Sequence, residues 1–172
     1  MPIRRAFLCF KSFARDGDTD PFETAELSQI LIDAIAYMAE KFSSHGIKLE
    51  IEQIPDVPLL CRAVQISQVV TNLIGNAFDA ISDQPNSWVK IKVQIIEHMV
   101  QIQIIDSGSG ISKNVEQNLF TPFYTTKPAG KGTGLGLSIS MGIVKDHGGR
   151  IFIDKRNKNT AFVVELPIAV AA

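Results

Sequence analysis

Hydrophobic and polar residues follow two periods along the chain, and each period predicts a different element. A period of about 3.6 residues predicts helices over residues 24–44, 62–82 and 135–147, with a shorter one near 115–119. Strict alternation predicts strands near residues 47–51, 89–95, 100–104, 150–154 and 161–166. Pro55 and Pro58 end the first strand, and the next two are close enough to pair as an antiparallel hairpin. Such interspersed elements predict an α+β fold in which helices cover one face of a sheet.

The composition narrows the class of protein. The chain has 172 residues, 45% of them hydrophobic, which suits one compact domain with a proper core. Its 17 basic and 18 acidic residues give a net charge of −1, which argues against a basic nucleic-acid-binding protein and against a disordered chain. No apolar run approaches the ~20 residues of a membrane span. We therefore expect a soluble, intracellular domain that binds no nucleic acid.

The cysteines and the N-terminal segment indicate no metal site, disulfide framework or secretory signal. Cys9 and Cys61 are isolated and form no CxxC motif, so neither a zinc site nor a disulfide framework is predicted, and both are expected to be small core residues. Residues 1–15 carry only basic charges and residues 16–26 only acidic ones. The apolar run at 6–10 is too short for a secretory signal, so a helical lead-in followed by a polar linker is the preferred interpretation.

The helix expected at 62–82 carries an unusual polar stripe. Asn72, Asn76 and Asp79 lie on one side of it, opposite a broad apolar side. Asn and Asp are poor helix formers, and their hard oxygen atoms suit Mg²⁺. The stripe is either a ligand face or a plain solvent-exposed face.

Two glycine-containing segments follow. In the first, Asp106 ends a strand and Gly108 and Gly110 come next, an arrangement that either admits a flat ring close to the backbone or simply makes a tight turn. The second, residues 131–137 (KGTGLGL), leads directly into an apolar helix. Glycines at a helix N-terminus expose N–H groups to an anion. The segment fits neither a Walker A loop nor GxGxxG, but it favours a phosphate site.

The order of these segments is more specific than any one of them. NLIGNAFD (72–79), DSGSGI (106–111), FTPFYTTK (120–127) and GTGLGL (132–137) resemble the four boxes of the ATP-binding domain shared by DNA gyrase, the heat-shock chaperone, the mismatch-repair ATPase and sensor histidine kinases. TPFYTTK and HGGRIFI (147–153) resemble sensor histidine kinases within that superfamily. The resemblance implies the Bergerat fold, a two-layer α/β sandwich with a mixed, mostly antiparallel sheet covered on one face by about three helices.

The resemblance also implies roles for individual residues, with ATP and Mg²⁺ as cofactors. Asn72 and Asn76 match catalytic positions, Asn76 as the Mg²⁺ ligand, and Asp106 matches the carboxylate that binds the adenine amino group. Residues 112–133 match a mobile lid, with Phe120 and Phe123 as its anchors. The full set expected to bind ATP is Asn76, Asp79, Asp106, Gly108, Gly110, Ile111, Phe120, Thr126, Lys127, Lys131, Gly132, Thr133, Gly134, Leu135, Gly136 and Leu137.

Positions 72 and 79 distinguish this chain within the superfamily. The resemblance implies that the ATP-hydrolysing relatives have a glutamate at the position that matches Asn72, where it acts as a general base. Asn72 cannot deprotonate water, and this favours phosphoryl transfer over hydrolysis. Many histidine kinases carry a basic residue where this chain has Asp79. Lys127 and Lys131 are expected to supply that charge, or Asp79 bonds within its own helix face.

The three histidines do not resemble a phosphoacceptor. His45, His98 and His147 lie at a predicted helix end, a hairpin tip and a helix end, and none has the acidic neighbour that the family's acceptor has. We therefore interpret residues 1–20 as a remnant of a dimerisation helix and linker, and residues 21–172 as the catalytic domain of a longer, homodimeric kinase. Its expected partners are a histidine-bearing dimerisation domain and a response regulator receiver domain. The domain itself is expected in the cytoplasm, whether or not the full protein is anchored to a membrane. The alternatives are an anti-sigma-type serine kinase and a non-catalytic nucleotide-sensing module.

Overall fold

The computed structural model describes residues 20–128 and 132–169. The predicted remnant of a dimerisation helix therefore lies almost entirely outside the described residues, as do Cys9 and Lys131. Along the described ranges the elements are β1 (Glu23–Glu26), α2 (Leu27–Ser44), β2 (Lys48–Ile51), β3 (Pro58–Cys61), α3 (Ala63–Ile81), β4 (Trp88–Ile96), β5 (Met99–Asp106), α4 (Lys113–Asn118), α5 (Gly136–Asp146), β6 (Arg150–Ile153) and β7 (Ala161–Pro167).

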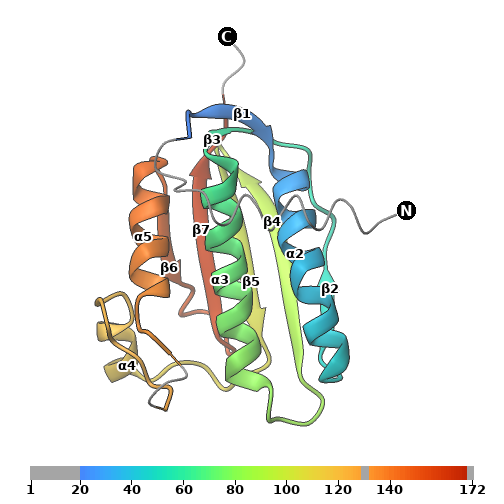
Figure 1. Cartoon of the computed structure of the whole chain (residues 1–172), viewed down its shortest axis with the longest axis vertical. Coiled ribbons are helices and arrows are strands. Elements are labelled where there is room, and N and C mark those ends of the chain that lie inside the picture. The colour runs from blue at the N-terminus through green and yellow to red at the C-terminus, as the bar shows by residue number, and fades with distance from the viewer. Residues whose placement is uncertain (1–19, 129–131, 170–172) are drawn as a thin grey trace.

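Five strands form one sheet in the order β2-β4-β5-β7-β6. The β2–β4 pair is parallel and the other three pairs are antiparallel, so the sheet is mixed and mostly antiparallel. Helices α2, α3 and α5 lie side by side over one of its faces (Figure 1). The α+β fold class and the two-layer arrangement expected from the sequence are confirmed.

The core lies between the helices and the sheet. Leu73 and Ile74 on α3 are fully buried, as are Val100 and Ile102 on β5. Full burial of an aliphatic side chain contributes roughly 1.5–3 kcal/mol, so the apolar side of α3 fixes that helix against the sheet. The polar stripe of α3 consequently faces away from the core.

The opposite face of the sheet is polar. Gln94, Gln101, Glu165 and Arg150 form a hydrogen-bonded row across β4, β5, β7 and β6, with two bonds of 2.6 Å and an ion pair between Arg150 and Glu165. The Arg150 guanidinium holds the pKa of Glu165 below its ordinary value. The alternation seen in the sequence therefore separates an apolar inner face from a polar outer face.

A second, two-stranded sheet was not predicted. The sequence pattern extended the first helix back to residue 24, whereas Glu23–Glu26 form β1, paired antiparallel with β3. Leu59 and Cys61 on β3 are buried while Leu60 is exposed. Burial raises the pKa of the Cys61 thiol to about 11, so this cysteine is an unreactive core residue, as expected.

Candidate functional site

A pocket of about 720 Å³ opens between α3, α5 and the segment that joins β5 to α5. Most of the residues singled out from the sequence line it, although they come from four separate stretches of chain. They are Asn72, Asn76, Asp79, Asp106, Gly110, Ile111, Thr126, Lys127, Gly132, Thr133, Gly134, Gly136 and Leu137. Among the described residues, three that were expected to bind ATP are not in the lining: Gly108, Phe120 and Leu135.

The polar stripe of α3 forms one wall of the pocket. The Asn72 amide donates a hydrogen bond of 2.9 Å to the Ser140 hydroxyl of α5, which fixes the orientation of the side chain. A Cβ on Gly136, at the start of α5, would collide with Asn72 Oδ1. Glycine at position 136 therefore lets α5 begin directly against the stripe. Of the two interpretations of the stripe, a ligand face is the one that a position in the pocket wall favours, and binding by its residues stays a prediction.

Asp106 forms the buried end of the pocket. Only 2% of this residue is exposed, and its Oδ1 accepts a hydrogen bond of 2.8 Å from the Gly108 amide. Burial raises the pKa of Asp106, while the bonds from the Gly108 amide and the Thr160 hydroxyl favour the charged form and oppose the rise. A Cβ on Gly108 would lie 2.7 Å from Asp106 Oδ1. Gly108 thus bonds Asp106 and holds its carboxylate in place, and its expected contact with ATP stays a prediction.

The glycine-rich segment crosses over the lid segment at one point. Gly134 has a φ of +67°, and its Cα lies so close to the Phe123 carbonyl that a Cβ there would collide with it. Only glycine combines that backbone conformation with so close an approach. The crossing holds the glycines beside the N-terminus of α5, where backbone N–H groups and the helix dipole favour an anion.

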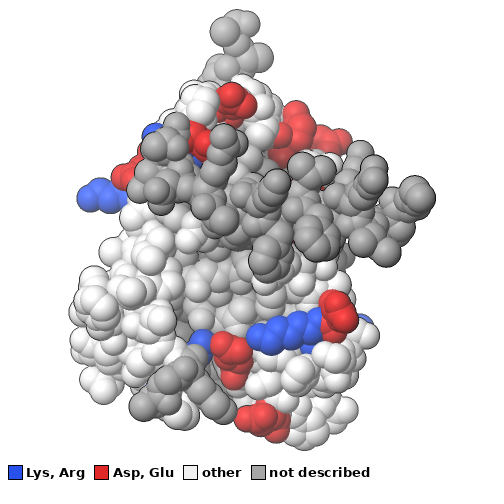
Figure 2. Space-filling model, viewed as in Figure 1, with Lys and Arg blue, Asp and Glu red and all other residues white. Residues whose placement is uncertain are grey.

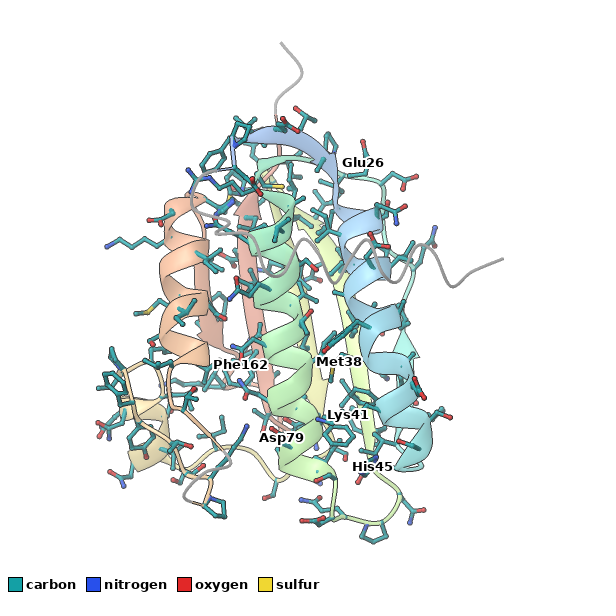
Figure 3. The ribbon with its side chains drawn as sticks, viewed as in Figure 1. Glu26, Met38, Lys41, His45, Asp79 and Phe162 are labelled. Carbon is teal, nitrogen blue, oxygen red and sulfur yellow. The ribbon has the colours of Figure 1, made fainter. Side chains whose placement is uncertain are left out.

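Opposite charges meet where α3, α2 and the lid segment come together. The Lys127 ammonium donates to Asp79 Oδ2 over 2.6 Å and to Asn76 Oδ1 over 3.3 Å. On the other side of the carboxylate, Lys41 Nζ of α2 lies 3.7 Å from Asp79 Oδ1. Figure 3 shows Lys41 and Asp79 at the same level of the two neighbouring helices, and Figure 2 shows basic and acidic side chains adjacent at the lower end of this face. The expected alternative, an Asp79 bonded within its own helix face, is wrong.

The lid segment is attached to the domain near its beginning. The Ser112 hydroxyl caps α4 by accepting from the Val115 amide, and Glu116 pairs with Lys155 of the β6–β7 turn at 2.6 Å. Phe120 packs against the core, as its expected anchoring role requires, but 74% of Phe123 is exposed. The expectation that Phe123 is a second anchor is therefore wrong, because the crossing with Gly134 uses its backbone and leaves its ring in solvent.

Several lining residues were missed by sequence reasoning. Thr160 and Phe162 reach the pocket because β7 pairs with β5, so that Phe162 lies opposite Ile104 and the Thr160 carbonyl accepts from the Asp106 amide. A local pattern contains no information on that pairing. Tyr124 and Thr125 also line the pocket, and the TPFYTTK box that contains them was the available signal. The other missed residues are Gly75, Ala80, Val115, Leu119 and Pro128.

Two of the three histidines make contacts within the fold, and the third is exposed. His147 is buried, its Nε2 accepts from the Arg62 amide at 3.0 Å, and its Nδ1 lies 2.7 Å from the Ile143 carbonyl. His45 follows α2, with Nδ1 3.0 Å from the Lys41 carbonyl, and its ring packs edge-on against Phe78. His98 lies exposed at the tip of the β4–β5 hairpin. None of them lies in the pocket lining.

The described part of the chain contains no group of three His, Cys, Asp or Glu side chains able to hold a metal. Asn76 Oδ1 nevertheless already accepts from a cationic group, the Lys127 ammonium. An amide oxygen that faces a cation in the wall of this pocket fits Mg²⁺, which takes one or two protein ligands and completes its shell with water and phosphate. Within residues 20–128 and 132–169, no helix combines the length and apolar composition that crossing a bilayer requires.

Comparisons with known proteins identify relatives. Residues 61–170 match the family described as Histidine kinase-, DNA gyrase B-, and HSP90-like ATPase. Sporulation kinase E of Bacillus subtilis (strain 168) is 32% identical over 149 residues, which cover 86% of this chain but 20% of that protein. The solved catalytic domain of histidine kinase ThkA, in a nucleotide-free form, is 31% identical with a TM-score of 0.77, and the match covers 86% of this chain and 96% of that one. A structure of ThkA in complex with the response regulator protein TrrA matches with a TM-score of 0.74 at 26% identity, over 97% of this chain and 48% of that one.

Proposed function

This chain belongs to the histidine kinase-, DNA gyrase B- and HSP90-like ATPase family, and we propose that it is the ATP-binding catalytic domain of a sensor histidine kinase. The match over residues 61–170 confirms the family expected from the four motifs. The chain spans about a fifth of the length of sporulation kinase E, so the activity proposed here is that of one domain within a longer protein.

A single observation carries the proposal: one pocket combines a buried carboxylate, a stripe of amides and a glycine-rich helix N-terminus. Asp106 accepts a hydrogen bond from the adenine amino group, and Ile111 and Leu137 contact the purine. Gly132, Gly134 and Gly136 offer backbone N–H groups to the phosphates at the start of α5. Thr126, Thr133 and Lys127 add side-chain donors from the lid segment and the glycine loop.

Asn76 and the nucleotide's own phosphates would hold Mg²⁺, which neutralises phosphate charge when bound. Asn72 is fixed by Ser140 and faces the start of α5. An amide cannot accept a proton from an attacking water, so this wall of the pocket orients phosphate but does not promote hydrolysis. The arrangement favours transfer of the γ-phosphoryl group to a side chain over release of free phosphate.

The acceptor is a histidine on a dimerisation domain outside this chain. His147 is buried with both ring nitrogens engaged, and His45 and His98 lie away from the pocket. Since ThkA is known in complex with a response regulator protein, we extend the proposal to a receiver domain that takes the phosphoryl group from the acceptor histidine.

The test is phosphorylation with γ-labelled ATP and Mg²⁺. We expect the isolated chain to bind ATP without labelling itself, and a histidine-bearing dimerisation domain of a related sensor kinase, supplied in trans and as an N-terminal fusion, to acquire acid-labile label. Acid-stable label would indicate a serine kinase. Binding of ATP without transfer in either arrangement would indicate a nucleotide-sensing module, and stoichiometric, acid-labile labelling of the isolated chain would contradict the assignment of the acceptor.

A further inference from the structure

We propose that Asp79 is a positioning residue that holds the Lys127 ammonium beside Asn76, where it meets the phosphates of the bound nucleotide. The proposal rests on the proposed function, because it requires phosphates in the pocket. An acidic residue on the wall of a pocket for a polyanion is otherwise unfavourable, since like charges repel.

Lys127 is the only basic residue among the described residues that line the pocket. It belongs to the lid segment, far from α3 in sequence, yet its Nζ lies within hydrogen-bond distance of two α3 side chains, Asp79 and Asn76. An ammonium group has three donor hydrogens. One donor bonds the Asp79 carboxylate. When Mg²⁺ takes Asn76 Oδ1, the bond to that oxygen is released, and the ammonium has donors for phosphate oxygens.

Positioning matters for a lysine in particular. Its four-carbon side chain has many rotamers, and the ammonium group of an unpaired lysine at the rim of a pocket would occupy many positions. The side chains of Lys127 and Asp79 are 31% and 38% exposed, so solvent screens the pair and its contribution to folding stability is small. Its effect is on where the ammonium lies.

Lys41 removes the electrostatic objection to a carboxylate at this position. Its Nζ lies 3.7 Å from the second oxygen of Asp79 and 4.0 Å from the centre of the Phe78 ring, which fixes it on the side away from the pocket. One carboxylate between two ammonium groups gives the cluster a net charge of +1. The side facing the pocket is the Lys127 side, so a polyphosphate meets positive charge.

The experiment compares binding of ATP and adenosine to the whole chain by isothermal titration calorimetry with Mg²⁺ present. Adenosine occupies the Asp106 end without phosphates, so it reports on the integrity of the pocket. The variants are Asp79→Asn, Lys127→Met, the double substitution, Asp79→Glu as a conservative rescue, and Lys41→Met as a control that removes the other ion pair of Asp79.

We expect Lys127→Met to weaken ATP binding about tenfold and Asp79→Asn roughly fivefold, with adenosine binding unchanged in both. The double variant should be no weaker than Lys127→Met, because both changes remove one interaction. Asp79→Glu should restore most of the affinity. Lys41→Met lowers the net charge of the cluster from +1 to 0 but leaves the pair of Lys127 and Asp79 in place, so it should weaken ATP binding less than Asp79→Asn does.

Three results for Asp79→Asn would overturn the inference while leaving the proposed function intact. The variant could bind ATP with wild-type affinity, or more tightly, in which case the pair of Asp79 and Lys127 holds the pocket closed. It could also lose affinity equally for ATP and adenosine, which would indicate a purely structural role. Failure of the wild-type chain to bind ATP would instead overturn the proposed function and this inference with it.

Discussion

Asp106 shows at the scale of one residue how the fold creates a binding group. A buried carboxylate is costly unless hydrogen bonds compensate it. The Gly108 amide and the Thr160 hydroxyl supply two such bonds, and a ligand with an exocyclic amino group would supply a further one. The residue is therefore prepared to accept a hydrogen bond that water cannot easily provide at this depth.

Because burial raises the pKa of Asp106 above its ordinary value of 3.8, purine binding should weaken on acidification at a higher pH than an ordinary aspartate would give. Protonation removes the charge that the amino group binds. We expect adenosine affinity, measured by NMR titration from neutral pH downward, to fall as the pH approaches the raised pKa of Asp106. In Asp106→Asn, affinity should be lower by about tenfold or more and independent of pH.

A pH-independent affinity in the wild-type chain would contradict this role of Asp106.

The folding stability of the chain without nucleotide depends on pH in the opposite direction. A raised pKa in the folded state means that the native chain binds the proton more tightly than the unfolded chain. The contribution of this carboxyl to stability is therefore fully present at low pH and is lost as the pH rises through the folded-state pKa.

Sequence alone could identify site residues where the signal is local. Asn72, Asn76, Asp106 and the glycines lie in short boxes whose residue types already indicate their chemistry. Thr160 could not be found in this way, because its relation to Asp106 depends on the β5–β7 register. The bond between Lys127 and Asp79 could not be predicted either, since it joins two stretches 48 residues apart.

At the scale of elements, the two helices that form the pocket walls have different requirements. α3 is held mainly by its buried apolar side, and Asn72 of its polar stripe adds the bond to Ser140. α5 begins with a glycine that touches Asn72 and contains a second glycine, Gly142, with no neighbouring atom within 4 Å of an added Cβ. The same substitution in one helix should therefore have opposite effects at the two positions.

We expect Gly142→Ala to raise the free energy of unfolding by about 0.5–1 kcal/mol, the usual helical preference for alanine over glycine. Gly136→Ala should lower it by about 1 kcal/mol, because Asn72 must move and lose its bond to Ser140. Urea denaturation measures both. Equal stabilisation by the two substitutions would show that Asn72 moves away without cost.

The helices and the strands of the large sheet were predictable because burial on one side imposes a period on the sequence. The small sheet was not. Thr24, Ala25 and Glu26 are compatible with a helix, and only pairing with β3 makes them a strand. The Leu27 amide bonds the Val57 carbonyl at 2.9 Å, so the start of α2 is set by a long-range contact that periodicity does not contain.

At the scale of the whole molecule, the pocket joins the two layers. Its walls come from α3, α5, the ends of β5 and β7, and the segment between β5 and α5. A ligand that contacts all of them binds only the folded chain, so its binding free energy adds to that of folding.

We expect ATP with Mg²⁺ at a hundred times its Kd to raise the free energy of unfolding by about 2.7 kcal/mol. For a chain of this size that corresponds to a rise of roughly 5–10 °C in Tm. Differential scanning fluorimetry measures the shift, and Asp106→Asn at the same ATP concentration serves as the comparison, with a smaller shift expected. An unchanged Tm of the wild-type chain at saturating ATP would contradict the proposed site.

The edge strands of the large sheet affect how readily one molecule associates with another at high concentration. Its edge strands, β2 and β6, are only four residues long, and β2 carries the exposed Lys48 beside Glu50. Short, charged edges are poor templates for strand addition from another molecule, which is how soluble β-sheet proteins avoid edge-to-edge aggregation. Self-association of this chain is therefore expected to use surfaces other than the edges of this sheet.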